Sequence, residues 1–513
     1  MDSNLRISTY EMLFPLPHTP GFSLAVNGLY GAYDIITGQE EDCLRAAQAS
    51  PASLCALPQD TLERLMRRGH LLTSEPAQEE KNVRILSRLY QLLAYQSVVD
   101  LVILPTYNCN FRCAYCFERK RLKKGAEWLS RSMQPEMVSA IFAQMRAYQA
   151  QGRKLHSVIL YGGEPFLRVN RQLVAQIAQE AADLKMLLVA ITNGYELDAF
   201  LDLLKQIPFS SLQITVDGPE AVHDSRRYLA GGQGSYRRIM ENIEKALAIG
   251  VSIHLRVNVN RSNLDSALSL KEILESKHFT QNPHFHYYFK ATTGCFEDDP
   301  SNVLTDHELF EALYRKGICS ETDTRASRVY QDIAMRVKRA LTKKAYPSLS
   351  PSHCGASSNM LVVDPEGTLY TCWDIVSQEK YAVGFTDVET GRFCFNFNLP
   401  KWRTRTVDRM TPCTQCPLLM VCGGGCAIES EAAFGNRFHG TCGSVREAFA
   451  FSAPRVCEKA FAQNGERELS LSLFPLFDGL SATNRETLLT TTKQTEAFAL
   501  LKRRLTETQR YFG

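Results

Sequence analysis

Three cysteines within eight residues are the part of the chain best suited to hold metal. Cys109, Cys113 and Cys116 are spaced Cys-x3-Cys-x2-Cys and follow the apolar run 101–104. Three thiolates on one short loop can hold three irons of a cubane and leave the fourth iron without a protein ligand. An open iron suits chemistry, because a substrate or cofactor can coordinate there. A structural zinc site wants four ligands, and no nearby Cys or His supplies the fourth.

This spacing resembles the signature of the radical S-adenosylmethionine (SAM) superfamily. The resemblance implies that a [4Fe–4S] cluster on Cys109, Cys113 and Cys116 binds the amino and carboxylate groups of SAM at its open iron. An electron then cleaves SAM into methionine and a 5′-deoxyadenosyl radical, which abstracts a hydrogen atom. The resemblance also implies an external electron donor such as flavodoxin or ferredoxin.

Short polar motifs end the next three predicted strands, where the superfamily binds SAM. Taken alone, the Gly-Gly pair has the ordinary interpretation of a turn, and an arginine is commonly a solvated surface residue. The resemblance assigns Gly162, Gly163 and Glu164 to the SAM ammonium, places Asn193, Thr215 and Asp217 beside the ligand, adds Tyr115 of the cysteine loop, and pairs Arg227 with the SAM carboxylate.

A second cysteine pattern begins at Cys354. It runs Cys-x12-Gly-x4-Cys and, after a gap, Cys-x2-Cys-x5-Cys-x3-Cys followed by one more Cys; its members are Cys354, Cys372, Cys413, Cys416, Cys422, Cys426 and Cys442. Two zinc ribbons are the ordinary alternative, but seven thiolates fit poorly to two sites that each want four. The pattern resembles the seven-cysteine SPASM domain of radical SAM enzymes that mostly modify peptides and proteins.

The SPASM resemblance implies two auxiliary [4Fe–4S] clusters, and therefore three clusters in the whole enzyme. Cys413, Cys416, Cys422 and Cys442 would hold the outer one. Cys354, Cys372 and Cys426 would hold the inner one. The fourth ligand of the inner cluster stays open between an unpatterned cysteine such as Cys394 and a vacant iron.

Two substrate classes follow from the SPASM resemblance. One class matures ribosomally made precursor peptides by forming thioether or carbon–carbon crosslinks, and this is the predicted function. The other oxidises a Cys or Ser of sulfatases to formylglycine and carries an Asp directly after the Gly-x4-Cys cysteine. Here Trp373 takes that position and Asp374, a candidate catalytic base, follows it. A zinc-stabilised peptide-binding scaffold without catalysis is the alternative of another class.

Alternating strand and helix patterns surround the first cysteine motif and predict an α/β fold with a parallel sheet. The resemblance makes this a partial (β/α)6 barrel. Predicted strands cover 101–104, 155–161, 187–191, 212–216, 252–259 and 284–289, and predicted helices cover 136–150, 171–182 and 236–248.

The first residues predict a small α+β module. Residues 24–30 carry an Asn-Gly turn between apolar residues, which indicates a hairpin, and 39–47 and 61–68 are predicted helices. The order resembles a winged-helix module that captures a leader peptide by strand addition; an extension that only covers the barrel is the alternative. The predicted domains are 1–80 (recognition), 81–98 (linker or helix), 99–345 (barrel), 346–460 (SPASM) and 461–513 (a polar helical tail).

Composition excludes several function classes. The formal net charge of +3 over 513 residues gives no reason to expect nucleic acid. No apolar run is long enough to span a bilayer, and the first residues lack a signal-peptide pattern. Sixteen cysteines in a chain expected to be cytoplasmic indicate metal ligation rather than disulfides.

Overall fold

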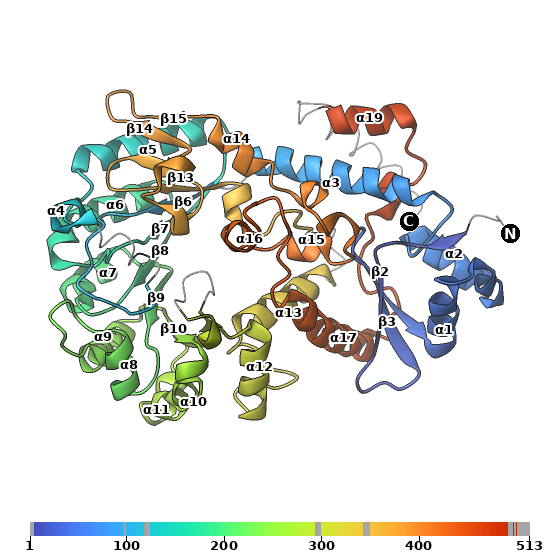
Figure 1. Ribbon diagram of the computed structural model, residues 1–513, viewed down its shortest axis with the longest axis horizontal. Coiled ribbons are helices and arrows are strands. Elements are labelled where there is room, and N and C mark those ends of the chain that lie inside the picture. Colours follow the sequence, from blue (N-terminus) through green and yellow to red (C-terminus); the bar gives the residue numbers. More distant parts are fainter. Residues whose placement is uncertain are drawn as a thin grey trace. The chain divides into compact units, whose positions relative to one another are not determined.

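A computed structural model of the chain describes residues 5–96, 99–116, 118, 124–292, 299–341, 349–490, 496 and 499. The chain divides into two compact units (Figure 1). Unit 1 comprises Met1–Leu93, Val329–Cys354 and Thr404–Gly513, and unit 2 comprises Ala94–Arg328 and Gly355–Arg403. The second cysteine pattern is therefore shared, because Cys372 belongs to unit 2 and its other six members to unit 1. In the described part of the chain, every helix is too short or too polar to cross a bilayer.

Unit 2 is built on one large sheet in which parallel strands dominate. The strand order is β11-β10-β9-β8-β7-β6-β12-β13-β14-β15, and neighbours from β11 to β12 are all parallel. The antiparallel strands β13 to β15 extend the sheet beyond β12. The bounds are β6 (Val99–Ile103), β7 (Leu155–Leu160), β8 (Leu187–Thr192), β9 (Ser211–Thr215), β10 (Ile253–Val259), β11 (Phe285–Ala291), β12 (Met360–Val363), β13 (Thr368–Tyr370), β14 (Gly384–Asp387) and β15 (Arg392–Phe395).

Helices connect the parallel strands and cover their outer side (Figure 1). Six strands in sequence order with helical crossovers are consistent with a partial (β/α) barrel. The helices of unit 2 are α4 (Ala126–Leu129), α5 (Pro135–Ala150), α6 (Arg171–Asp183), α7 (Leu201–Gln206), α8 (Glu220–Arg226), α9 (Tyr236–Ala248), α10 (Leu264–Leu268), α11 (Leu270–Ser276), α12 (Asp306–Arg315) and α14 (Asn398–Arg403).

The predicted strands and helices of this region are confirmed. Each of the six predicted strands overlaps one of β6 to β11, and helix α9 has the predicted bounds. In α9 the buried residues Ile239, Ile243 and Leu247 recur at helical spacing, which is why the pattern was readable from sequence.

Unit 1 begins with a three-stranded antiparallel sheet in the order β2-β3-β4, followed by two helices. Its strands are β1 (Arg6–Ile7), β2 (Glu11–Pro15), β3 (Phe22–Asn27), β4 (Ala32–Thr37) and β5 (Leu71–Leu72), and β1 pairs with β5. The helices that lie wholly or mainly in unit 1 are α1 (Gly38–Ala47), α2 (Gln59–Arg68), α3 (Pro76–Gln96), α13 (Arg328–Ala340), α15 (Leu419–Cys422), α16 (Ala427–Phe434), α17 (Val445–Asn464), α18 (Phe474–Phe477) and α19 (Ala482–Thr490). Helices α1 and α2 confirm the two predicted helices.

The hairpin prediction was right in kind but wrong in detail. Leu29 and Tyr30 do not begin the second strand; residues 28–31 form a loop, and β4 starts at Ala32. The Asn27 side chain accepts hydrogen bonds from the Leu29 and Tyr30 backbone N–H groups, each at 3.0 Å. Those donors are therefore turned inward, away from a strand ladder, and both side chains are buried.

The C-terminal segment is also different from the predicted polar helix. Arg467 and Leu469 lie extended along β4, where the Ile35 N–H donates to the Arg467 carbonyl at 2.7 Å and the Leu469 N–H donates to Tyr33 at 2.9 Å. The alternation of Leu469, Leu471 and Leu473 was the strand signal in the sequence. Residues 491–495, 497, 498 and 500–513 of the predicted tail lie outside the described residues.

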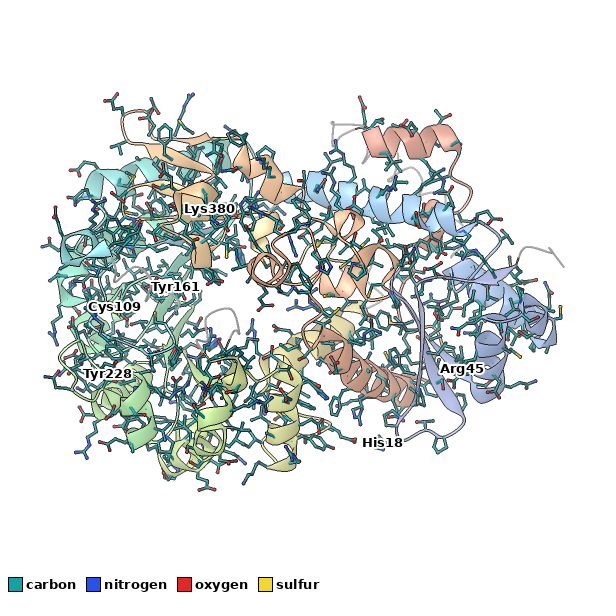
Figure 2. The ribbon with its side chains drawn as sticks, viewed as in Figure 1. His18, Arg45, Cys109, Tyr161, Tyr228 and Lys380 are labelled. Carbon is teal, nitrogen blue, oxygen red and sulfur yellow. The ribbon has the colours of Figure 1, made fainter. Side chains whose placement is uncertain are left out.

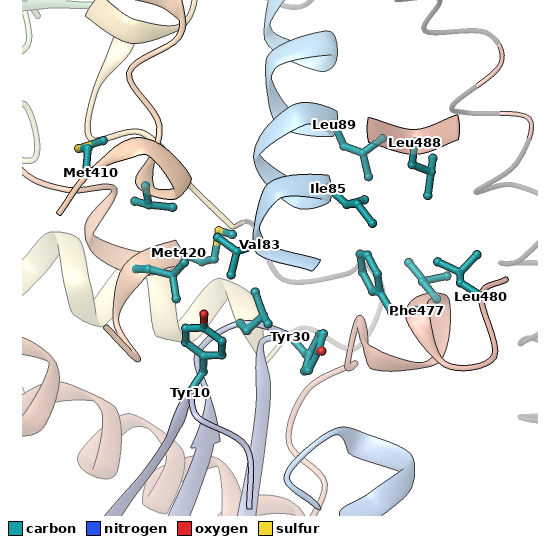
Figure 3. Close-up of a cluster of buried hydrophobic side chains, with 14 residues drawn as sticks. Tyr10, Tyr30, Val83, Ile85, Leu89, Met410, Met420, Phe477, Leu480 and Leu488 are labelled. Atoms are coloured by element: carbon teal, nitrogen blue, oxygen red, sulfur yellow. The ribbon is translucent and has the colours of Figure 1, made fainter. Parts of the chain in front are cut away.

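Helices α18 and α19 then contribute to a buried apolar cluster of unit 1 (Figure 3). Phe477 and Leu488 pack with Tyr30, Ile85 and other residues of α3 and of the loops next to the N-terminal strands. Helix α3 starts at Pro76, inside the predicted module 1–80, and continues through most of the segment 81–98 that was predicted to be a linker or helix. Apolar residues between 473 and 489 therefore belong to a core rather than to a polar tail.

His70 is a buried cation between two carboxylates of unit 1. Its Nδ1 lies 2.9 Å from Glu11 and its Nε2 lies 2.7 Å from Asp34. Burial opposes the charge, but Glu11 and Asp34 outweigh it and raise the pKa of His70 to about 9. Burial likewise opposes ionisation of Asp34, but Arg68 and His70 outweigh it and hold the pKa of that carboxyl below its usual range.

This arrangement predicts a loss of stability at alkaline pH. Because the pKa of His70 is higher in the folded state, its contribution is complete below pH 6.5 and is lost as pH rises through about 9. We expect the free energy of unfolding of unit 1 to fall by up to about 3 kcal/mol across that window. Hydrogen exchange of β3 and β4 amides measures it. A His70→Gln variant with the same pH profile as the native chain would contradict the assignment.

Candidate active site

The cysteine loop after β6 borders a cavity of about 440 Å³ in unit 2. Cys109, Cys113 and Cys116 all line it. The remaining lining residues come from the same loop, from β8, β9, β10 and the ends of strands, and from a segment after β13: Tyr107, Asn108, Phe111, Arg112, Tyr115, Glu118, Leu129, Tyr161, Gly162, Gly163, Glu164, Ile191, Thr192, Asn193, Gln213, Thr215, Arg227, Arg256, Asn258, Thr292, Trp373 and Asp374. Cys109 and Tyr161 are labelled in Figure 2. The structure thus brings together nearly every residue that the sequence proposed for SAM.

Backbone contacts set the conformation of the cysteine loop. The Glu164 N–H donates to the Asn108 carbonyl at 2.7 Å, and Arg112 donates to the Cys109 carbonyl at 2.8 Å. Burial raises the pKa of Cys109 well above its usual value and that of Cys116 to about 12. Buried thiols keep their protons unless a cation replaces them, so three such thiols on one cavity fit a metal cluster. Among the described lining residues there is no histidine and no fourth cysteine.

Gly162 and Gly163 occupy backbone conformations that only glycine adopts easily, with φ of 79° and 54°. A Cβ on Gly163 would lie 2.3 Å from the Asn108 carbonyl oxygen, and one on Gly162 would lie 2.3 Å from the Leu104 side chain. The pair therefore allows the end of β7 to approach the cysteine loop closely, which the sequence alone left as an ordinary turn.

Glu164 joins the ends of β7 and β8. Its buried carboxylate accepts hydrogen bonds from Thr192 Oγ1 and the Asn193 N–H, both at 2.6 Å, and from the Phe166 N–H at 2.8 Å. Burial raises the pKa of Glu164 to about 7 although these donors oppose it. The Asn193 amide in turn donates to Asn110 of the cysteine loop at 2.8 Å.

Arg227 is buried beside the cavity rather than solvated on the surface. Its Nη1 donates to the Tyr115 hydroxyl at 2.9 Å. Its buried Nε has no hydrogen-bond partner among the described residues. A buried guanidinium N–H without an acceptor is costly, so this donor is available to a ligand.

Asp217 differs from the other predicted SAM residues, because it does not line the cavity. It is fully buried, and its carboxylate accepts from the Asn258 N–H at 3.0 Å and from Arg226 at 3.4 Å. Asn258 also donates to the Tyr115 hydroxyl at 3.0 Å. The structure therefore places Asp217 behind the cavity wall, where it holds the residues that form the wall.

Sequence reasoning missed several lining residues on β9 and β10. The missed residues are Gln213, Arg256 and Asn258. Like Thr215, which was predicted, they are polar, and on each strand the two lining residues are two positions apart. Alternation of this kind on a buried strand puts polar side chains on one face, which is a signal that was present in the sequence. Tyr288 of β11 donates to Gln213 at 2.7 Å.

Asp374 reaches the cavity even though Trp373 separates it from Cys372. The Trp373 ring meets the Tyr161 ring edge-on, with centroids 5.4 Å apart. The Cys372 thiol lies 3.9 Å from the Asp374 carboxylate. The short 3-10 turn at 373–375 brings both side chains to the cavity.

Six of the seven cysteines of the second pattern lie in unit 1. Burial raises the pKa of Cys413 to about 12, and the nearby thiols of Cys422, Cys416 and Cys442 add to this effect. Cys354 acts in the same way on Cys426. In the described residues no three or more Cys, His, Asp or Glu side chains are arranged to hold a single metal ion. Burial and electrostatic effects are therefore what relate these cysteines to one another. Cys394, the cysteine suggested as a fourth ligand of the inner cluster, lies on β15 in unit 2.

Comparison with known proteins identifies the domain around the cavity. Residues 103–270 match the radical SAM superfamily. The chain is 28% identical over 234 residues to a probable GTP 3′,8-cyclase of Archaeoglobus fulgidus, covering 43% of this chain and 72% of that protein. It is 30% identical over 163 residues to the GTP 3′,8-cyclase of Actinobacillus pleuropneumoniae, covering 32% of this chain and 44% of that protein.

A solved structure resembles more of the chain. Native anSMEcpe with bound AdoMet and Cp18Cys peptide has a TM-score of 0.55 and 18% identity, covering 71% of this chain and 99% of anSMEcpe. This likeness shows a shared fold. Members of the matched superfamily are enzymes that bind SAM and a [4Fe–4S] cluster. Residues 103–270 are therefore a radical SAM domain, so the chain carries the domain of a superfamily of enzymes.

Proposed function

We propose that Cys109, Cys113 and Cys116 hold the SAM-cleaving [4Fe–4S] cluster and that SAM lies in the adjoining cavity. The observation that carries this proposal is the presence of all three thiols on one cavity together with the ends of β7, β8 and β9. When bound, the cluster supplies the electron that cleaves SAM into methionine and a 5′-deoxyadenosyl radical. The protein's own contribution is to hold SAM and substrate in fixed positions and to exclude water.

The cavity walls offer complementary groups for the two charges of the SAM amino acid. Glu164, whose carboxylate is oriented by Thr192 and Asn193, is the proposed partner of the ammonium, with the Gly162–Gly163 backbone. Arg227, with its unpartnered Nε, is the proposed partner of the carboxylate. Tyr115, Asn193 and Thr215 complete the proposed binding set. For Asp217 we propose a positioning role, since it contacts Asn258 and Arg226 rather than the cavity.

We propose that the substrate is a ribosomally made precursor peptide and that the product carries a thioether or carbon–carbon crosslink. Support comes from the seven-cysteine pattern, from the mutual influence of the thiols in unit 1, and from the fold shared with anSMEcpe, which has been solved with a peptide. Cys413, Cys416, Cys422 and Cys442 are the proposed ligands of an outer auxiliary cluster. Cys354, Cys372 and Cys426 are the proposed ligands of an inner one.

We also propose that the N-terminal sheet and helices of unit 1 recognise the leader of this peptide. The edge of the sheet at β4 is already paired with the chain's own Arg467 and Leu469. Strand addition at that edge would have to displace buried residues of the C-terminal segment. The edge at β2 is therefore the proposed place for a leader strand.

Anaerobic reconstitution tests the enzyme proposal directly. We expect a brown protein with about twelve irons, four for each of three clusters. With SAM and dithionite or flavodoxin it should release 5′-deoxyadenosine, and with its peptide it should remove two hydrogen atoms per crosslink, as mass spectrometry would show. Precursor peptides encoded in neighbouring reading frames are the first substrates to try. A colourless protein, or one that never releases 5′-deoxyadenosine, would disprove it.

Formylglycine formation is the second candidate, and the position of Asp374 in the cavity favours it. A carboxylate beside the substrate can take up the proton that leaves when a Cys or Ser side chain is oxidised. Incubation with Cys- and Ser-containing sulfatase peptides separates the candidates. Formylglycine in the product would replace the crosslinking proposal.

Replacing Asp374 with Asn tests its role in either reaction. None of the proposed SAM contacts depends on the charge of Asp374. We therefore expect the release of 5′-deoxyadenosine without substrate to stay within about twofold of that of the native chain. Loss of a general base typically costs about 100-fold or more, so we expect product formation to fall by that factor. Asp387→Asn at the end of β14, outside the cavity, is the control. An equal loss of 5′-deoxyadenosine and of modified peptide would instead indicate that Asp374 supports SAM binding.

A further inference from the structure

Arg405 of unit 1 is a buried cation whose hydrogen-bond partners are all neutral. Its side chain is among the largest fully buried ones in the described chain, with a relative exposure of 1%. All three of its nitrogens donate. The acceptors are the carbonyls of Arg437 (2.5 Å), Gly425 (2.8 Å), Gly424 (3.3 Å) and His439 (3.4 Å) and the hydroxyl of Ser430 (3.1 Å).

A buried guanidinium stays charged, so it needs a negative partner or pays a large desolvation cost. Burial lowers the pKa of Arg405, and the groups that counter this effect are the thiols of Cys354, Cys426, Cys413 and Cys422. Carbonyl dipoles alone do not neutralise a charge. Cysteines of the second pattern are therefore nearby groups that, as thiolates, can balance the charge of Arg405.

The loop that receives Arg405 also faces a cysteine. Gly423, Gly424 and Gly425 all have positive φ, between 68° and 83°. The carbonyls of Gly424 and Gly425 accept from Arg405, while the backbone N–H groups of the same two glycines act to lower the pKa of the nearby Cys422 thiol, against the larger opposite effect of burial. In the trans peptide unit between Gly424 and Gly425, carbonyl and N–H point in opposite directions. By holding the Gly424 carbonyl, Arg405 therefore also fixes the direction of the Gly425 N–H, which faces Cys422.

Close packing makes this loop conformation specific. A Cβ on Gly425 would lie 2.0 Å from the Thr441 carbonyl oxygen, next to Cys442. A Cβ on Gly440 would lie 2.3 Å from the Cys413 sulfur. The backbone at Gly440 is therefore packed against the Cys413 sulfur, and the backbone at Gly425 is packed against Thr441. Arg405 donates to carbonyls of both segments, Gly425 and His439.

We propose that Arg405 is the counter-cation and positioning residue of an anionic iron–sulfur cluster at Cys413, Cys416, Cys422 and Cys442, and that it raises the reduction potential of this cluster. The inference rests on the outer auxiliary cluster of the proposed function. Reduction adds negative charge to a cluster, so a nearby positive charge and N–H groups aimed at its sulfurs stabilise the reduced form. The sign follows directly: removing the guanidinium must lower the potential.

The test uses full-length chain reconstituted with iron and sulfide, in a Cys109→Ala, Cys113→Ala, Cys116→Ala background that removes the signal of the SAM cluster. Arg405→Met, Arg405→Lys and the control Arg409→Met are compared; Arg409 is four residues away and its side chain is 54% exposed. Iron content and the midpoint potential from EPR-monitored titration are measured. We expect Arg405→Met to shift the reduction equilibrium about tenfold toward the oxidised form, which is about 59 mV for one electron. Arg405→Lys should shift it less, and Arg409→Met not at all.

Each outcome decides a separate point. Background protein without iron at these cysteines would overturn the auxiliary cluster and, with it, the role of Arg405. Full iron with an unchanged potential in Arg405→Met would overturn the role of Arg405 and leave the cluster standing. If Arg405→Met fails to retain iron, Arg405→Lys carries the test. A lowered potential in Arg405→Lys then supports the proposal, and a potential and iron content equal to those of the background protein overturn it.

Discussion

Replacing Cys109, Cys113 and Cys116 together with Ala is expected to abolish 5′-deoxyadenosine release. These are the three thiols on the cavity, and without them the described lining residues include no cysteine or histidine that could hold iron next to the proposed SAM site. The iron content should fall from about twelve to about eight atoms per chain, because the auxiliary clusters keep their own ligands. Anaerobic iron and sulfide analysis and chromatographic detection of 5′-deoxyadenosine measure both effects.

Two further cysteine variants make this result specific. Cys416→Ala should keep 5′-deoxyadenosine release but lower crosslinked product or stability, because Cys416 belongs to the group in unit 1. Cys55→Ser, at an exposed cysteine outside both patterns, should change neither. Release of 5′-deoxyadenosine by the triple variant above the background of protein-free controls would show that the cluster lies elsewhere.

Replacing Gly163 with Ala is the second change with a large expected effect. The new Cβ would lie 2.3 Å from the Asn108 carbonyl oxygen and 2.9 Å from that of Thr106, and both belong to the backbone that leads into the cysteine loop. A rigid backbone cannot rotate aside as a long side chain would, so the cysteine loop has to move. A displacement of about 1 Å at a reaction centre can cost about 100-fold in rate. We expect a loss of that size in 5′-deoxyadenosine release.

Gly152→Ala is the matched control for this change. Gly152 also has a positive φ, of 81°, but a Cβ there would meet nothing within 4 Å. Both variants therefore carry similar backbone strain, about 1–2 kcal/mol, and differ in the steric contact. Gly152→Ala should keep its rate and cluster content. Similar rate losses in both variants would show that strain, rather than contact with the cysteine loop, is responsible.

The barrel strands could be predicted because their signals are local. Runs such as 187–191 and the apolar stripe of α9 lie within a single element, and each specifies its strand or helix without help from distant residues. The four motifs that follow strands β6 to β9 were predicted to meet because carboxyl ends of parallel strands share one edge of a sheet. The cavity shows that this expectation holds for all of them except Asp217.

Features that depend on distant partners were predicted less well. The loop at Leu29 and Tyr30 is decided by the Asn27 side chain and by burial in a core shared with Phe477, more than four hundred residues later. The extended segment at Leu469 likewise depends on a partner that is distant in the sequence, because it pairs with β4. The alternation of leucines from Leu469 to Leu473 was visible in the sequence. Only the folded structure shows that this segment pairs with the edge of β4.

The sequence by itself therefore determined which residues the chain offers for chemistry: the spaced cysteines, the succession of parallel strands along the chain and the residues that follow those strands. Tertiary structure decided which of those residues face the cavity, that Asp217 stands behind its wall, and that Asp374 reaches it in spite of Trp373. It also decided that Arg405 is buried against the glycine loop of the second cysteine group. The physical reason is that residue type and spacing are properties of the chain, whereas burial and electrostatic partners exist only after distant segments have packed together.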